Sequence, residues 1–237
     1  MYRLNLFGGV SIDGMEGPVI GRAVQRHRLA LLGILAASLS PGVSRDKLVM
    51  YLWPERSAAR ARHALADSIY RLNEALGASA VLAVGDQLRL NCAIVGSDVG
   101  MFRDAFASGI WEDAARVYCG PFMDGFFLPG ALEFERWLER MRERLDGEYG
   151  RALESLAAQR AASGDAGGAV AAWRQRAMLD RYDSRVAMRL MEALVAAGNS
   201  AAAMRHAHSH ARLVEEELGT HPVPEIITFA ERLRTGG

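Results

Sequence analysis

The stretch SRDKLVMYLWPERSAARARHALADSIYRLNEALG, residues 44–77, decides the fold of the first part of this chain. Ser44 can cap a helix that ends at Trp53-Pro54, because the residue before a proline is restricted to extended backbone. Ser57 can cap a second helix that runs to Gly77, a suitable glycine just beyond a helix end. Two helices joined by a tight turn predict a helix-turn-helix, whose second helix enters the major groove of DNA.

The second of these helices has an apolar face and a polar face. At about 100° per residue, the apolar face collects Ala61, Leu65, Ser68, Ile69, Leu72 and Leu76. The polar face collects Arg60, His63, Asp67, Tyr70, Arg71 and Glu74. Arginine, histidine and tyrosine suit contacts with phosphates and base edges, whereas the two acids do not suit phosphate. An ordinary amphipathic helix with a solvated, mixed-charge face shows the same pattern, so both interpretations stand at this point.

The flanking segments extend this motif into a winged helix. Short strands are predicted before it, at Tyr2–Phe7, Val10–Ile12 and Val19-Ile20. A helix over residues 24–38 follows them and is ended by Pro41-Gly42. After the motif, the segment VLAVGDQLRLN, residues 81–91, predicts a β-hairpin that turns at Gly85-Asp86 and exposes Arg89. Strands, three helices and a terminal hairpin together predict a winged helix with an N-terminal sheet.

The net charge of zero hides an asymmetry between two parts of the chain. Residues 1–96 carry 11 Lys and Arg against 7 Asp and Glu, whereas residues 97–237 carry 17 against 21. Such an asymmetry favours a nucleic-acid-facing module joined to a protein-facing one. We therefore expect a winged-helix DNA-binding domain over residues 1–96 and a helical domain over residues 97–237.

The composition indicates a cytoplasmic protein. No run of eighteen apolar residues predicts a membrane span, and Met1 leads directly into a strand, with no basic and apolar leader pattern. Cys92 and Cys119 are too few for a disulfide framework and lack a CxxC spacing. We expect two reduced thiols and no membrane partner.

The second part of the chain contains an internal repeat. The turn at residues 162–165 (ASGD) recurs at residues 196–199 (AAGN), 34 residues later, which is the period of tetratricopeptide helix pairs. An earlier copy at residues 107–109 is offset by 55 residues, so the segment 120–149 is predicted to be an insert. The predicted fold class is mainly α: an N-terminal winged helix-turn-helix with a small β-sheet and a wing hairpin, followed by an all-α tetratricopeptide-like domain.

No pattern in the sequence predicts catalysis or a cofactor. The motifs GxxxxGK[ST], HExxH, GxSxG and GxGxxG are missing, so we expect no enzyme and no nucleotide-driven switch. His206 and His210 are spaced i,i+4, as in a metal pair. Polar residues are ordinary on the second helix of a repeat, however, so we expect solvated histidines and no metal site. Trp111, Trp137 and Trp173 are predicted to pack in the core.

Five segments resemble the SARP-type bacterial activators. They are Leu52-Trp53-Pro54, the helix ending in RLNEALG, residues 120–128 (GPFMDGFFL), residues 133–138 (EFERWL) and residues 216–233 (EELGTHPVPEIITFAERL). That family joins an OmpR-type winged helix to a helical bacterial transcriptional activator domain. The resemblance implies binding to double-stranded promoter DNA, often at direct repeats near the −35 element, and recruitment of RNA polymerase. It also implies self-association, as a homo-oligomer formed through the helical domain.

The chain departs from the family in the helix predicted to read DNA. Relatives usually carry Arg-Gln at the positions of Ala66-Asp67, and basic residues near Asn73-Glu74. Either Asp67 accepts a hydrogen bond from cytosine N4 and shifts specificity, or the winged helix no longer reads DNA and serves as a non-enzymatic protein-interaction module. The predicted DNA-binding residues are Arg45, Lys47, Arg60, Arg62, His63, Asp67, Tyr70, Arg71 and Arg89.

Overall fold

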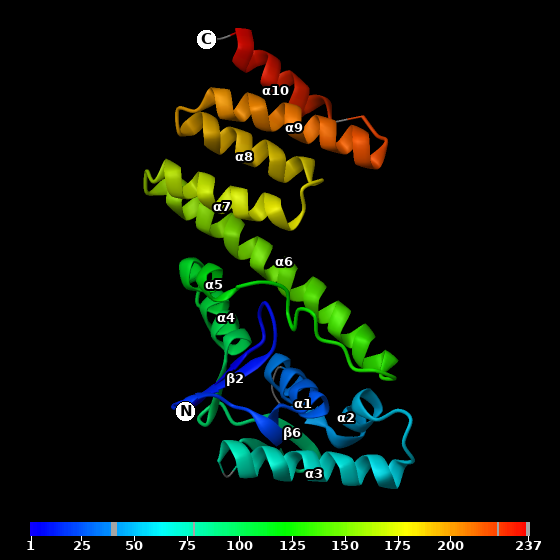
Figure 1. Ribbon diagram of the computed structural model, residues 1–237. Coiled ribbons are helices and arrows are strands. Elements are labelled where there is room, and N and C mark those ends of the chain that lie inside the picture. Colours follow the sequence, from blue (N-terminus) through cyan, green and yellow to red (C-terminus); the bar gives the residue numbers. More distant parts are fainter. Residues whose placement is uncertain (39–41, 78, 222, 236–237) are drawn as a thin grey trace. The chain divides into compact units, whose positions relative to one another are not determined.

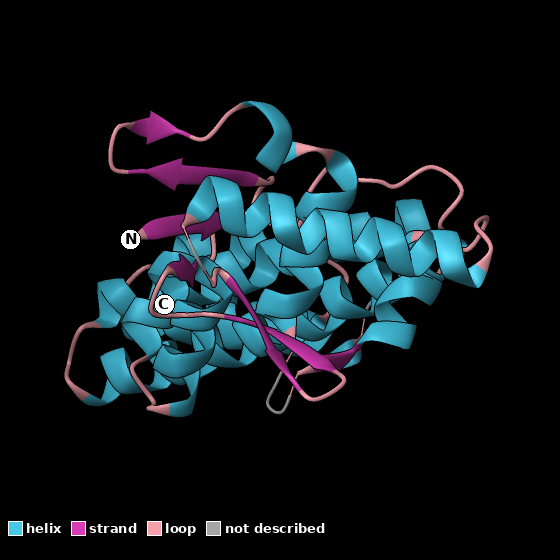
Figure 2. Cartoon of the chain, turned by 90° about the horizontal axis from the view of Figure 1, so that it is seen from below, coloured by secondary structure: helices cyan, strands magenta, loops and turns pink. Residues whose placement is uncertain are grey.

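The structure, a computed structural model, describes residues 1–38, 42–77, 79–221 and 223–235. By packing it divides into two compact units, Met1–Gly147 and Glu148–Gly237. The long helix α6, Leu132–Ala162, contributes its first half to one unit and its second half to the other. Figure 2 shows that helices make up most of the fold, and the predicted mainly α class is confirmed.

An N-terminal sheet opens the first unit. Its strands are β1 (Tyr2–Asn5), β2 (Ser11–Gly14), β3 (Gly17–Pro18) and β7 (Val95–Ser97), in the order β3-β2-β1-β7. The predicted strand at Val19-Ile20 is wrong in its bounds, because the short turn after β2 makes Gly17 and Pro18 the paired residues. The N–H of Val19 still donates to the carbonyl of Ile12 at 2.8 Å, so the chain returns along β2 as expected.

The helix-turn-helix follows, as predicted. The 3-10 turn η1 (Gly21–Val24) leads into α1 (Arg26–Ala37), and β4 (Val43–Ser44) leads into α2 (Arg45–Leu52) and α3 (Ala58–Leu76). Ser44 caps α2 with its hydroxyl, which accepts from the N–H of Lys47 at 3.4 Å. Ser57 stands at the start of α3 without a side-chain capping bond. Pro41, predicted to end α1, lies outside the described residues.

The wing is the hairpin of β5 (Val81–Val84) and β6 (Gln87–Leu90), which β4 extends into a sheet of order β4-β6-β5. Gly42 precedes β4 at a φ of 132°, where a Cβ would come within 2.7 Å of the carbonyl oxygen of Leu88. Glycine is therefore needed there for β4 to approach β6. The predicted winged helix is complete in this unit.

Helices after the wing pack in the same unit as the winged helix. They are α4 (Asp98–Ala107), α5 (Trp111–Val117) and the first half of α6. Asp98, at the start of α4, is buried, and its Oδ2 accepts from the N–H groups of Leu6 at 2.7 Å and Phe7 at 2.9 Å. Burial raises the pKa of Asp98, although these backbone donors oppose the shift. Asp98 thus connects the end of β1 to α4.

The insert predicted at residues 120–149 folds onto the winged helix. Phe122 forms β-bridges with Phe7 and Gly9, and the N–H of Met123 donates to the carbonyl of Leu6 at 2.6 Å. Arg142 of α6 holds the same segment by donating to the carbonyls of Phe122 at 2.9 Å and Met123 at 2.7 Å. The compact units therefore divide at 147/148, and not at the predicted 96/97. Packing alone does not test which ranges act by themselves, so the predicted domain ranges stay a prediction.

The second unit is a stack of helix pairs. Figure 1 shows α7 (Ala166–Leu179), α8 (Ser184–Ala196), α9 (Ser200–Leu218) and α10 (Pro224–Thr235) lying side by side in chain order. The 34-residue repeat marks equivalent turns, in which Asp165 caps α7 by accepting from Gly168 N–H at 2.8 Å and Asn199 caps α9 by accepting from Ala202 N–H at 3.0 Å. The core between the pairs contains Val170, Leu190, Met191, Leu194 and Ile226.

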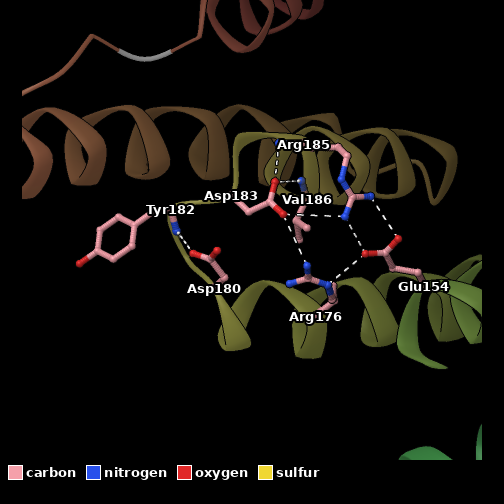
Figure 3. A network of polar contacts seen from close by, with 7 residues as sticks. All are labelled: Glu154, Arg176, Asp180, Tyr182, Asp183, Arg185 and Val186. Carbon is pink, nitrogen blue, oxygen red and sulfur yellow. Dashed lines mark hydrogen bonds and ion pairs between the residues drawn. The ribbon is translucent and has the colours of Figure 1, made fainter. Parts of the chain in front are cut away.

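A charge network joins the first helix pair of this unit, the second half of α6 with α7, to the next pair, α8 with α9 (Figure 3). Glu154 of α6 accepts from Arg176 Nε of α7 at 3.1 Å and from Arg185 Nη2 of α8 at 2.7 Å. Asp183, which caps α8, lies 3.5 Å from Arg176 Nη2. The hydrogen bond from Arg185 is the main cause that lowers the pKa of Glu154. The network favours one stacking of the two pairs.

Candidate nucleic-acid interface

The helix α3 presents the predicted polar face to solvent. Its buried residues are Ala61, Leu65, Ser68, Leu72 and Leu76, which all belong to the predicted apolar face. Because these residues fix the rotation of the helix about its axis, the opposite face is left open to a ligand. That face has two parts with different surroundings.

The first half of α3 is cationic and accessible. Arg60, Arg62 and His63 are exposed, and the first turn holds no acidic residue. Within the described part of the chain, the side chains of Arg60 and His63 make no hydrogen bond or ion pair. Arg62 lies 3.2 Å from Asp46 of α2, but both side chains are more than half exposed, so the pair is weak. These three side chains can be offered to phosphates or base edges.

The second half of α3 carries a closed set of ion pairs. Asp67 Oδ2 accepts from Nη2 of Arg28 in α1 at 3.1 Å, and Asp67 Oδ1 lies 3.6 Å from Arg71 Nε. Arg71 also donates to Glu74 at 3.0 Å, and its guanidinium lies 5.4 Å from the ring centroid of Tyr70. The hydrogen bond with Glu74 raises the pKa of Arg71. Asp67 and Arg71 are therefore engaged within the protein.

The remaining predicted residues lie on α2 and the wing. Arg45 starts α2, and its N–H donates to the carbonyl of Asp86 in the wing turn at 3.1 Å. Lys47 is exposed, with Nζ 5.7 Å from the ring centroid of the buried Tyr51. Arg89 is exposed on β6. The backbone hydrogen bond from Arg45 joins the start of α2 to the wing turn, and Arg89 follows that turn on β6.

Sequence reasoning missed Arg28. It lies in the apolar run of α1, and its side chain is only 8% exposed. A buried guanidinium needs an opposite charge, because removing it from water is costly. The signal was an arginine inside an apolar run of a helix, combined with an acid on the polar face of the helix predicted to read DNA. The separation of 39 positions between Arg28 and Asp67 hid the pairing.

The helix α9 shows that one expectation about histidines was wrong. His210 is buried, at 4% exposure, and a ring nitrogen lies 3.1 Å from Ser184 Oγ. His206 is half-buried, and its Nε2 has no hydrogen-bond partner among the described residues. Burial lowers the pKa of both histidines, which favours neutral rings. Over the described residues, no group of three or more acidic, histidine or cysteine side chains is arranged to hold a metal ion.

The tryptophans predicted to pack in the core are half-buried: Trp111 contacts the ring of Phe106, and Trp173 packs against the core of the helix pairs. Trp137 lies within 6.2 Å of the rings of Tyr51, Phe122 and Phe134, measured between centroids. Trp53, at the end of α2, is stacked on His27 of α1 at 5.3 Å. Trp137 thus holds α2 against the first half of α6, and Trp53 holds the end of α2 against α1. None of the helices in the described ranges combines the length and apolar character that crossing a membrane requires.

Comparisons with known proteins place these features in context. The model of a family described as "Bacterial transcriptional activator domain" matches residues 103–234. Among solved structures, Mycobacterium tuberculosis EmbR in complex with a low affinity phosphopeptide is similar, with a TM-score of 0.66 and 20% identity over 99% of this chain. The match spans 65% of that chain, and at this identity it shows the fold alone. No curated protein matches the sequence.

Proposed function

This chain belongs to the family of the bacterial transcriptional activator domain, as its sequence predicted, and we propose that it regulates transcription by binding promoter DNA through α3. The observation that carries the proposal is the first half of α3. Three cationic or titratable side chains stand exposed there, on a helix whose opposite face is buried in a winged helix.

The proposed complex places α3 in the major groove. Helix-turn-helix proteins contact base edges with the N-terminal part of this helix, while neighbouring elements bind the backbone. Arg60 and His63 are proposed to reach base edges, and Arg62 to exchange Asp46 for a phosphate. Lys47 and Arg45 at the start of α2, and Arg89 on the wing, supply further phosphate contacts.

We propose that residues 98–237 activate transcription, through contacts with other proteins. Residues 98–147 carry 6 basic and 10 acidic residues, whereas residues 148–237 carry 11 of each. The acidic excess therefore lies next to the winged helix, and the helix pairs are neutral. Neutral helix pairs do not compete for DNA, which suits contacts with RNA polymerase or with a second copy of this chain. Direct promoter repeats are the expected sites, because the family resemblance implies them.

The phosphopeptide in the EmbR complex is a ligand of that larger protein. This chain spans only part of its length, and our proposal for this chain concerns DNA. No catalytic step is proposed.

The test is retention of genomic fragments by the purified full chain, followed by sequencing. We expect promoter fragments that share a repeated motif. The double variant Arg60→Ala, His63→Ala should lose this enrichment, whereas Arg189→Ala, which removes an exposed arginine of α8, should retain it. A folded wild-type protein that enriches no fragment would favour the protein-interaction module, the function that Asp67, Glu74 and the zero net charge support.

A further inference from the structure

We propose that Arg28 is a positioning residue that holds the second half of α3 through Asp67, and that base readout is confined to the first half of the helix. This inference rests on the proposed function, because readout presumes that α3 binds DNA. It assigns Asp67 the role of a counter-ion, in place of either a base-reading residue or a misplaced acid.

Arg28 lies at a position that is buried in the scaffold of the winged helix. It is a residue of α1, whose side chains from Arg28 to Leu35 are all buried. The Arg28 guanidinium reaches Asp67 Oδ2 at 3.1 Å, while the Asp67 side chain is 46% exposed. The pair therefore joins an internal scaffold helix to the partly exposed flank of α3. Removing the Asp67 carboxylate would leave the buried Arg28 cation with less opposite charge near it, which would destabilise the folded protein.

The two carboxylate oxygens of Asp67 both face arginine side chains of this protein. Oδ2 faces Arg28 and Oδ1 faces Arg71. Accepting from cytosine N4 through Oδ1 would compete with the ion pair to Arg71, and accepting through Oδ2 would compete with the bond from Arg28. The DNA contact would then exchange an interaction with a cation for a bond from a neutral amine, which is the weaker of the two. Reading cytosine is thus unfavourable at this position.

Arg71 is paired with acidic side chains of its own helix. Its guanidinium faces Asp67 on one side and Glu74 on the other, and its side chain is only 31% exposed. Arg28, Asp67, Arg71 and Glu74 together have no net charge. A phosphate therefore meets little attraction along this half of the helix, whereas in the first half Arg62 pairs with Asp46, and Arg60 and His63 have no acidic partner among the described residues. Tyr70 is 61% exposed in the second half, so the balance of charge, and not accessibility, directs DNA contacts to the first half of α3.

Two measurements on the full chain test the proposal. The first is the ratio of affinities for a selected site and for unrelated DNA, with folding checked by circular dichroism. Arg60→Ala should lower this ratio about tenfold, the loss expected for a base contact. Asp67→Asn and Arg71→Ala should leave the ratio within about twofold. A ratio in Asp67→Asn that falls as far as in Arg60→Ala would overturn the assignment of Asp67.

The second measurement is thermal melting of Arg28→Met, Asp67→Asn and the double variant. Paired residues give non-additive effects, so the double variant should melt above the temperature that the two single shifts together predict. Arg28→Lys, which keeps the charge, should recover part of the loss seen in Arg28→Met. Additive shifts would overturn the positioning role. A wild type that binds no DNA would overturn the proposed function and the readout claim, while the melting result would still decide the role of Arg28.

Discussion

The buried guanidinium of Arg28 in α1 donates to the half-exposed carboxylate of Asp67 in α3 at 3.1 Å. An acid on the polar face of a DNA-reading helix would ordinarily repel phosphate. Here it neutralises a cation of the scaffold and lies beside a second arginine of its own helix. The departure from the family pattern at Asp67 is therefore accounted for within the protein.

Arg60 gives the first prediction. Arg60→Ala should weaken binding to the selected promoter site about tenfold, because an exposed arginine that has no partner among the described residues is available for a base edge. Fluorescence anisotropy with a labelled duplex measures the change, and Arg189→Ala of α8 is the matched control. Unchanged affinity in Arg60→Ala would remove this residue from the interface.

Asp67 is predicted to contribute to the stability of the protein and not to its DNA sequence specificity. Asp67→Asn should lower the free energy of unfolding by about 1–2 kcal/mol, less than for a fully buried pair because the carboxylate is half exposed. Its preferred DNA sequence should stay that of the wild type. Urea titration and selection from random duplexes measure the two properties. A variant as stable as the wild type would contradict the role of counter-ion.

Asp98 is predicted to be essential for the first unit. Asp98→Ala removes the acceptor of the Leu6 and Phe7 N–H groups and should destabilise the protein by about 2–4 kcal/mol, the cost of two buried donors left without partners. Asp104→Ala, an exposed position on the same helix, should change stability little. Equal unfolding midpoints for the two variants would show that the bonds of Asp98 contribute nothing.

Glu154 gives a prediction that depends on pH. Hydrogen bonds from Arg185 and Arg176 lower the pKa of Glu154 in the folded protein. A carboxyl group with a lowered folded pKa stabilises the protein above its ordinary pKa, and this contribution disappears as pH falls through the folded value. Glu154→Gln should thus cost about 1 kcal/mol at neutral pH, and the difference from wild type should vanish in acid.

The control for Glu154 is Glu192→Gln, which breaks an exposed i,i+3 pair with Arg189 and should cost at most about 0.5 kcal/mol. Urea titrations of the three proteins at neutral and acidic pH give the comparison. A loss in Glu154→Gln that persists unchanged into acid would exclude the proposed linkage.

Self-association on DNA is predicted from the modest charge of the winged helix. One module with a net charge of +4 over residues 1–96 has little non-specific affinity, so tight binding requires a second, tethered contact. The full chain should bind two direct half-sites cooperatively and one half-site weakly. Inserting half a helical turn between the half-sites should abolish cooperativity, and equal binding to all three duplexes would contradict the prediction.

The sequence predicted the elements whose signals are local. Ser44, the Trp53-Pro54 stop and the apolar period of α3 located the helix-turn-helix, and the repeated turns at residues 162–165 and 196–199 located the helix pairs. The family assignment is confirmed, because the model of the bacterial transcriptional activator domain matches residues 103–234.

The features that sequence analysis missed depend on residues far apart in the chain. The pairing of Phe122 with Phe7 carries no periodic signal, so the insert was not placed on the winged helix. His210 is buried because α9 packs against α8, where Ser184 lies within hydrogen-bond distance of the ring. Arg28 and Asp67 belong to different helices, and only the packing of α1 against α3 shows that the acid has an internal partner.

The central claim is that the first half of α3 reads promoter DNA. Its most direct test is selection of bound sequences from a random duplex pool, run in parallel with the wild-type full chain and with Arg60→Ala, His63→Ala. The account predicts a defined repeated motif for the wild type and loss of preference at specific positions of each repeat for the variant. An identical motif from both proteins, or none from a folded wild type, would contradict it.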